Sequence, residues 1–383
     1  MQRRQFIAGS LALPLIMAAQ APDLAMAARP PRRPLRVVLT GQALLKHDLT
    51  DDQWPAASQF RSFFSGADAV FTDLEVAIKG RYAEAPLRDG MFLHAADARI
   101  IDRLANVGFN MFATSNNHAH DLGAGGIRDA IDALDARHLT HAGTGMDLAK
   151  ASAPGYRVTE AGIVALVAMA SGLYKGQRAA PNKPGVNEVR RGPGGEPDGP
   201  ASGLDESDVR QYLASIKEAA AKADIVIAYQ HNHYWEKDMA DTPPWQRRLA
   251  RRAIDAGASI FVSHGAPLLH GIEIYKGKPI FYDLGGLFFQ TSTPLGYYPP
   301  EVWQSAVVDC RCTKAGFDRI SLTAVELNDT GTGGSADMTT RGMPKLTEGA
   351  EGKKIIARIA RLSENYGTRF TFTPRGADIV IRA

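Results

Sequence analysis

Little in the bulk composition of this 383-residue chain marks it as a specialised class of protein. The formal net charge is only +3 and no basic stripe stands out, so the composition gives no reason to expect a nucleic acid as a partner. Hydrophobic residues make up 45% of the chain and charged residues 22%, which is typical of a globular protein with a large core. The length allows two domains or one large α/β domain.

Cysteine is scarce, and a glycine-rich nucleotide motif is missing. Cys310 and Cys312 are the only two cysteines. A disulfide between residues two apart on one strand is strained and uncommon, so the pair indicates packing residues, with a weak redox or metal pair as the alternative. No Gly-x-Gly-x-x-Gly motif follows the first expected strand, which argues against a dinucleotide-binding protein.

The N-terminus carries an apolar run that is short for a membrane span. It extends from Phe6 to Ala19, about 14 residues where roughly 20 are needed. Arg3 and Arg4 precede the run and an Ala-Met-Ala sequence follows it, which predicts a signal peptide over residues 1–27. Arg-Arg-Gln-Phe-Ile is similar to a twin-arginine export signal. We therefore expect a periplasmic or extracellular protein, with an uncleaved membrane anchor as the alternative.

Strand and helix patterns alternate along the rest of the chain, which indicates a layered α/β core. Expected strands cover residues 35–41, 69–75, 109–115, 139–145, 224–230, 259–264, 302–310 and 317–327, and expected helices cover residues 96–108, 123–138, 205–223 and 244–256. Residues 271–290 predict a hairpin that turns at Lys276 and Gly277.

Composition shifts suggest the domain boundaries. Residues 28–34 predict a stiff, charged linker, and residues 35–328 a single α/β domain. Residues 329–383 predict a flexible polar segment followed by a small C-terminal extension with one helix and two short strands. Within the domain, residues 175–205 are dense in Gly, Pro and charge, so this stretch is expected to be a functional or mobile loop.

Metal-type side chains follow five of the expected strands. In open α/β sheets, ligands bind beyond the carboxyl ends of the strands. The side chains at these ends are Gln42, His47, Asp48, Asp73, Glu75, Asn116, Asn117, His118, His231, His233 and His264. Histidine, amide and carboxylate ligands without cysteine fit Zn²⁺, Mn²⁺ or Fe. One or two such ions can activate water for displacement at phosphorus.

Four segments then identify a relationship. FTDLE, SNNHAHDLGAGGIRDAIDAL, AYQHNHYWEKD and IDAGASIFVSHGAPLLHGIEIYKGKPIFYDLGGLFF resemble the capsule-synthesis CapA family, which is linked to capsule and poly-γ-glutamate production. The resemblance extends from about Leu35 to Gln290. That family belongs to the calcineurin-like metallophosphoesterases, so the resemblance implies a four-layer α/β/β/α sandwich. It also implies one or two divalent metal ions and an anionic exopolymer or phosphoester substrate, with the cell-envelope polymer-export machinery as a further candidate partner.

The family pattern implies a role for each matching residue. Glu75 matches an acidic residue that bridges metals, and Asn117 matches an amide ligand. His118 matches the histidine that faces the scissile phosphate, and Asp121 the carboxylate that orients it. The remaining implied metal ligands are His231, His233 and His264.

Two departures from the family pattern leave the function open. Gln42 stands where the family has an aspartate, and Pro267 stands where it has a last histidine. Substitute ligands within reach of the pattern are Gln42 itself, His47, Asp48, Asp73 and His270. The sequence therefore supports two hypotheses: a metal-dependent hydrolase of the metallophosphoesterase type, or a binding or assembly protein for an exopolymer with a partly degraded metal centre.

Overall fold

The structure, a computed structural model, describes residues 33–88, 90–192 and 203–381. The predicted signal peptide and most of the predicted linker lie outside these ranges. Among the described residues, no helix has both the length and the apolar character that crossing a membrane requires. The chain from Arg33 onward forms one unit, so the predicted domain and the C-terminal extension belong to the same body.

The first sheet is mixed and has nine strands among the described residues. Its central strands run parallel, and their partners towards the C-terminus of the chain run antiparallel. The strands are β1 (Leu35–Leu39), β3 (Ala69–Asp73), β6 (Met111–Ala113), β7 (Thr140–Ala142), β17 (Gln304–Thr313), β18 (Gly316–Leu327), β19 (Pro344–Leu346), β20 (Phe370–Thr373) and β21 (Gly376–Ile379). β1, β3, β6 and β7 are the parallel set, as the strand–helix alternation predicted.

The second sheet has six strands in the described part of the chain. They are β9 (Gly155–Val158), β10 (Ile163–Ser171), β12 (Ile225–Asn232), β13 (Ile260–His264), β14 (Ile272–Tyr275) and β15 (Lys278–Phe281). The hairpin of β14 and β15 turns at Lys276 and Gly277, as predicted. The sequence interpretation missed β10, although its apolar run IVALVAMAS is typical of a strand buried on both faces.

Seven α-helices accompany the sheets in the ranges that the structure describes. They are α1 (Ala57–Phe64), α2 (Arg99–Val107), α3 (Gly123–Asp135), α4 (Leu148–Ser152), α5 (Glu206–Lys222), α6 (Pro244–Asp255) and α7 (Gly349–Leu362). The sequence interpretation also missed α1. Short strand pairs complete the fold: β2 (Gln42–Leu44) with β16 (Gly286–Phe289), β4 (Ala77–Lys79) with β5 (Ala95–Asp97), and β8 (Thr144–Gly145) with β11 (Gly185–Val186).

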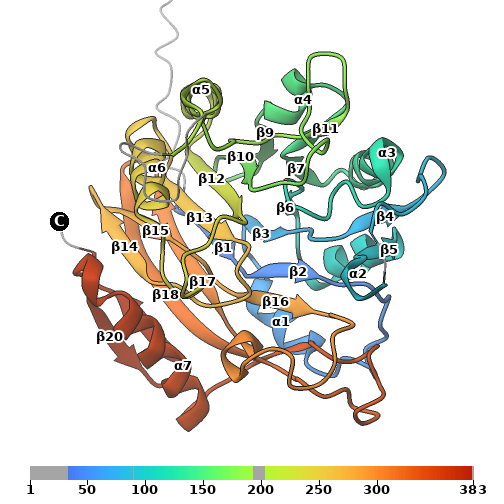
Figure 1. The fold of residues 1–383 in the computed structure, drawn as a ribbon. Helices are drawn as coiled ribbons and strands as arrows, with labels where there is room; N and C mark the ends of the chain where they lie inside the picture. The colour runs from blue at the N-terminus through green and yellow to red at the C-terminus, as the bar shows by residue number, and fades with distance from the viewer. Residues whose placement is uncertain (1–32, 89, 193–202, 382–383) are drawn as a thin grey trace, which may run out of the picture. The chain divides into compact units, whose positions relative to one another are not determined.

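Alternating side chains divide the core into layers. In β1, Val37 and Leu39 join the apolar cluster between the two sheets, whereas Val38 joins the cluster under α1, α2 and α3. In β10, Leu166 faces the central cluster and Val167 the cluster under α5 and α6. Figure 1 shows α5 and α6 beside the second sheet and α3 on the other side. The predicted four-layer α/β/β/α sandwich is confirmed.

The segment after residue 328 is built into the first sheet. Ile355, Ile356 and Ile359 of α7 are buried in the central apolar cluster, and β21 pairs with β18. Asn328 donates its side-chain amide to Thr340 O at 2.7 Å, which ties the two ends of the polar stretch together. Cys310 and Cys312 are free and buried in the same central cluster, as the packing interpretation predicted.

The topology brings the functional side chains to one edge. β12 runs parallel to both β10 and β13, so His231 lies opposite His264 in register. β3 runs parallel to β1 and β6, so Asp73 lies opposite Ala113. The carboxyl ends of the parallel strands therefore carry the predicted ligands, as the strand-end rule requires.

Candidate metal centre and its pocket

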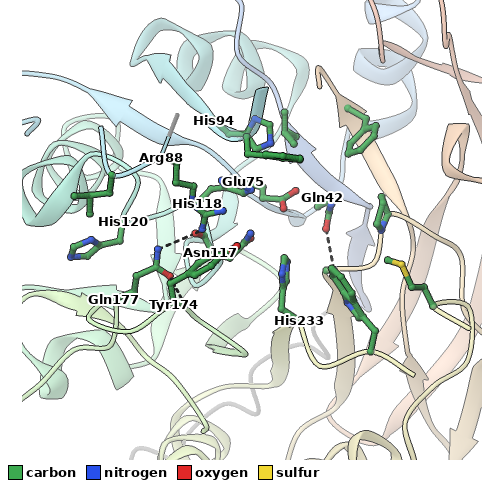
Figure 2. A pocket seen from close by; sticks show the side chains of 18 of the residues that line it. Gln42, Glu75, Arg88, His94, Asn117, His118, His120, Tyr174, Gln177 and His233 are labelled. Carbon is green, nitrogen blue, oxygen red and sulfur yellow. Dashed lines mark hydrogen bonds between the residues drawn. The ribbon is translucent and has the colours of Figure 1, made fainter. Parts of the chain in front are cut away.

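A pocket of about 940 Å³ opens at this edge. Its polar lining includes Glu75 after β3, Asn117 and His118 after β6, and His233 after β12. Figure 2 shows Glu75, Asn117, His118 and Arg88 close together, with Gln42 beside Glu75 and His233 reaching towards them. These side chains belong to loops far apart in sequence, which the two sheets bring to one place.

Ligand atoms of Glu75, His231 and His233 lie within 4.8 Å of one another. His231 Nε2 is 2.9 Å from Asn117 Oδ1 and 3.8 Å from Glu75 Oε1, so a fourth donor joins the group. Glu75 Oε2 and His233 Nε2 are buried and have no hydrogen-bond partner. Buried polar atoms without partners are costly, and a carboxylate, an amide oxygen and two imidazoles are a suitable donor set for one divalent cation. These residues fit a metal ion. We call them the histidine side of the pocket.

A buried carboxylate supports His231 from behind. Asp73 Oδ2 lies 3.2 Å from His231 Nδ1, on the ring nitrogen opposite the one that faces Glu75. Asn116 donates its amide to Asp73 Oδ1 at 2.9 Å and to Leu74 O at 2.8 Å. A carboxylate on the far nitrogen of a metal-binding imidazole fixes the tautomer and the ring orientation. The structure therefore places Asp73, a predicted substitute ligand, behind His231.

The pKa shifts of the buried carboxyl and imidazole groups are those expected of a cation site without its cation. Burial, with the nearby Asp73 and Asp283, raises the pKa of Glu75 well above its usual range. Burial raises the pKa of Asp73 to about 7. Burial lowers the pKa of His231 to about 3 and that of His233 well below its usual range. Neutral imidazoles bind metals, and a divalent ion would favour the ionised carboxylates that burial opposes.

His118 is held beside the metal-type cluster by a carboxylate. Its Nδ1 is 2.8 Å from Asp121 Oδ2, which leaves Nε2 as the free ring nitrogen. Arg88 Nε lies 2.7 Å from the other oxygen of Asp121, so that carboxylate bridges a guanidinium and an imidazole. Burial raises the pKa of Asp121 to about 7, and Arg88 opposes that rise. The orienting role that the family pattern implied for Asp121 agrees with this geometry.

The turn after β6 owes its shape to Asn116 and Gly123. Asn116 Oδ1 accepts from His118 N at 3.1 Å, so one amide side chain bonds both the turn and the end of β3. Gly123 has φ of 68°, and a Cβ there would overlap the carboxyl group of Glu84. Only glycine takes this conformation without strain, so α3 begins directly behind Asp121.

The opposite part of the pocket lacks free donors. Gln42 Oε1 accepts from Gly265 N at 3.1 Å, so its oxygen already has a partner (Figure 2). Gly265 has φ of 128°, and a Cβ there would overlap Asn232 O. Pro267 lines the pocket beside it and has no ligand atom. These three residues, which we call the glutamine side, do not fit a second metal ion.

The other predicted ligands lie in several places. His264 is buried on β13, outside the group of converging ligand atoms, and neither of its ring nitrogens has a hydrogen-bond partner. Its role as a ligand stays a prediction. His47 and Asp48 are exposed and do not line the pocket, and Asp48 lies 3.6 Å from Arg103. His270 Nε2 donates to Met239 O at 2.7 Å, away from the cluster.

The sequence interpretation missed two pocket residues and one buried carboxylate near the cluster. Arg88 contacts Asp121, donates to Asn117 O and lies over the Tyr174 ring at 4.4 Å. The His94 ring meets the His118 ring edge-on, with centroids 4.1 Å apart, and burial lowers its pKa to about 2. Arg88 and His94 lie in the irregular segment between β4 and β5 and not at the end of a sheet strand, so the strand-end rule could not find them. The buried carboxylate is Asp283, which helps to raise the pKa of Glu75. It lies in the segment that ends in FYDLGGLFF, but the sequence interpretation assigned it no role.

Comparisons with known proteins agree with the segments that the sequence singled out. The family model "Bacterial capsule synthesis protein PGA_cap" matches residues 36–291. An uncharacterized protein of Sinorhizobium fredii is 28% identical over 429 aligned positions, which cover 88% of this chain and 91% of that protein. The PGA biosynthesis protein CapA of Bacillus subtilis is 29% identical over 228 positions, 59% of this chain and 53% of its own length.

A solved structure also shares some of the arrangement. It is the 5'-nucleotidase precursor from Thermus thermophilus, with 14% sequence identity and a TM-score of 0.35, covering 85% of this chain and 58% of that one. This likeness is too weak for a comparison of the two sites.

Proposed function

Since this chain belongs to the family of bacterial capsule synthesis proteins, we propose that it is an exported, metal-dependent hydrolase of the metallophosphoesterase type that acts in capsule or poly-γ-glutamate biosynthesis. Its proposed substrate is an anionic exopolymer or a phosphoester. The observation that supports the proposal is the convergence of Glu75, His231 and His233, because Glu75 and His233 line the same pocket as His118. A purely structural cluster would have its buried polar atoms paired, whereas Glu75 Oε2 and His233 Nε2 have no partner here.

Separate residues bind the metal and support its ligands in this proposal. We assign metal binding to Glu75, Asn117, His231 and His233, and the support of His231 to Asp73. A divalent cation such as Zn²⁺, Mn²⁺ or Fe²⁺ supplies Lewis-acid polarisation of an ester oxygen and lowers the pKa of water. Gln42 and Pro267 offer no donors to another ion, so we propose one ion per chain.

His118 is the proposed acid–base residue. Asp121 holds the proton of His118 at Nδ1, so Nε2 is the nitrogen that exchanges a proton with water or with the leaving oxygen. Arg88 balances the charge of Asp121, which keeps the carboxylate in place while the imidazole changes its charge. A held imidazole beside a metal-type cluster suits metal-assisted hydrolysis of an ester.

One observation favours a second function. The hydrogen bond from Gly265 N to Gln42 closes the glutamine side, as expected if this protein binds or assembles an exopolymer without cleaving it. Both functions require that the protein binds the polymer or ester, but only the hydrolase turns it over.

Metal analysis with an activity screen separates them. Protein purified from the periplasm is expected to carry about one Zn, Mn or Fe per chain. It is also expected to hydrolyse a member of a panel of phosphomonoesters, phosphodiesters and γ-glutamyl polymers supplied with Mn²⁺ or Zn²⁺. A metal-free protein whose melting temperature does not respond to added metal, and which turns over no compound, supports the binding function instead.

Export has its own test. Replacing Arg3 and Arg4 with Lys is expected to block periplasmic delivery, because a twin-arginine signal requires both guanidinium groups. Unchanged delivery of the double variant would point to the general secretion route or to a membrane anchor.

A further inference from the structure

We propose that the pocket takes an amphipathic anion: a single phosphate or carboxylate group joined to an apolar body. This inference rests on the proposed function for the position of the anionic group, and it narrows the substrate class. It comes from the part of the pocket that lies beyond the histidine side.

The wall around the glutamine side is apolar. It is made by Leu44, Met239, Pro267, Phe289 and Tyr298, which come from four separate segments of the chain. Gln42 is the polar side chain next to them, and its oxygen is already bonded to Gly265. A wall of this composition gains free energy by covering apolar surface and offers few partners to a polar group.

The rim of the pocket is rich in large aromatic and aliphatic side chains, although it is exposed to solvent. Ten large apolar side chains are exposed in the described part of the chain, and half of them line this one pocket. They are Leu87, Phe92, Tyr174, Trp235 and Tyr297. Leu87, Tyr174 and Tyr297 are 60%, 64% and 54% exposed, values that leave much of each side chain for a ligand to cover. Grouped exposed apolar residues mark a binding surface, whereas scattered ones need no explanation.

The charges fit one anionic group. Arg88 and Lys175 line the pocket, and Glu75 is the carboxylate in its lining. Arg88 is already balanced by Asp121, so a metal ion on Glu75 and the histidines would leave a small positive excess at one end. A uniformly charged polymer would need cations along the whole pocket, and the rim and the far wall have aromatic and aliphatic side chains there.

A sugar body fits less well than an apolar one. Sugars stack on aromatic rings, but their hydroxyl groups also need polar partners. Gln177, a buried residue of the lining, is occupied, since its amide donates to Asn117 O at 3.3 Å and its oxygen accepts from Tyr174 N at 3.2 Å. Leu87 and Met239 present aliphatic surface instead.

Titration calorimetry with a series of alkyl phosphates tests the inference. The metal-loaded protein is titrated with inorganic phosphate and with ethyl, butyl and hexyl phosphate. The dissociation constant is expected to fall roughly fourfold per added methylene, on the order of 200-fold from ethyl to hexyl phosphate. Hexyl phosphate should bind tighter than glucose 6-phosphate, which has the same head and a six-carbon polar body. Hexanoate in a parallel titration shows whether the anionic group is a carboxylate or a phosphate.

Matched variants locate the apolar body. In Leu87→Ser with Tyr297→Ser, the gain in affinity from ethyl to hexyl phosphate is expected to shrink by at least about tenfold. The affinity for inorganic phosphate should stay the same. The control is Val158→Ser with Phe372→Ser, two exposed apolar residues on β9 and β20 outside the pocket, which should leave the series unchanged. Melting temperatures confirm that both variants fold.

The outcomes separate this inference from the proposed hydrolase. Equal affinity across the alkyl series, absent binding, or tighter binding of glucose 6-phosphate or of a γ-glutamyl oligomer would overturn the inference, even if metal and turnover are found. A chain-length dependence that Leu87→Ser with Tyr297→Ser removes would support it. If that dependence appears in a protein without metal or turnover, the apolar site stands and the hydrolase fails.

Discussion

The histidine side and the glutamine side of the pocket share their position at strand ends but differ in how their polar atoms are paired. Both lie at the carboxyl ends of parallel strands, and both bury polar side chains. On the histidine side, Glu75 Oε2 and His233 Nε2 have no partner in the protein. On the glutamine side, the Gln42 oxygen accepts from Gly265 N. Residue type alone therefore does not identify a ligand, because the structure leaves buried ligand atoms without partners on the histidine side and bonds the Gln42 oxygen to the backbone.

Removing the histidine side should have the largest effect. His231→Ala with His233→Ala deletes two of the four proposed donors. We expect metal affinity to fall by more than the roughly 10–100-fold that losing an outer partner of a ligand costs. Metal content after dialysis, measured by plasma mass spectrometry, should drop from about one ion per chain to near zero. His270→Ala is the matched control, because that buried histidine bonds Met239 O outside the cluster. Equal metal content in both variants would contradict the assignment.

His118 tests whether the histidine side does more than bind. For a substrate found in the screen, His118→Ala is expected to lower kcat by roughly 10²–10⁴-fold, the usual contribution of a general acid or base. Metal content should stay near that of the wild type, because Asn117 is the proposed ligand. Asp121→Asn should have a smaller effect of the same kind, since it misorients the imidazole. Loss of metal in His118→Ala would make this residue a ligand, and unchanged turnover would move the active centre elsewhere.

Asp73 tests the support behind the metal cluster. Asp73→Asn keeps the volume and removes the charge beside His231 Nδ1, so the metal dissociation constant should rise roughly 10–100-fold in a chelator competition. Asp129→Asn is a suitable control: Asp129 is also buried, accepts from Tyr82 N at 3.0 Å and lies on α3 outside the pocket. A dissociation constant that matches the control would show that Asp73 only packs.

The glutamine side should matter least for metal binding. Gln42→Leu has a similar volume and removes the acceptor for Gly265 N, which leaves a buried donor unsatisfied. The free energy of unfolding should fall by about 1–3 kcal/mol, as measured with denaturant. Metal content should not change, because Gln42 is not a ligand in this assignment. A loss of metal in this variant would remove the distinction between the two sides.

Particular residues show how far the sequence could go. The resemblance to the family pattern implied that Asp121 orients His118, and the structure contains that contact with a ring nitrogen. The same reasoning offered Asp73 as a substitute ligand, because sequence cannot show which nitrogen of His231 a carboxylate meets. It missed Arg88 and His94, which reach the site from a loop with no periodic pattern.

The sequence by itself determined the layered α/β class, the family and the residues at the strand ends. Local periodicity fixes strands and helices, and parallel strands necessarily gather their carboxyl ends at one edge. Only the tertiary structure decided which of those side chains keep free donors, that Gln42 is bonded to Gly265, and that exposed apolar residues from separate loops surround one pocket. These features depend on distances of a few ångströms between segments far apart in the chain, and hydrogen-bond pairing at that scale is a property of the packed fold.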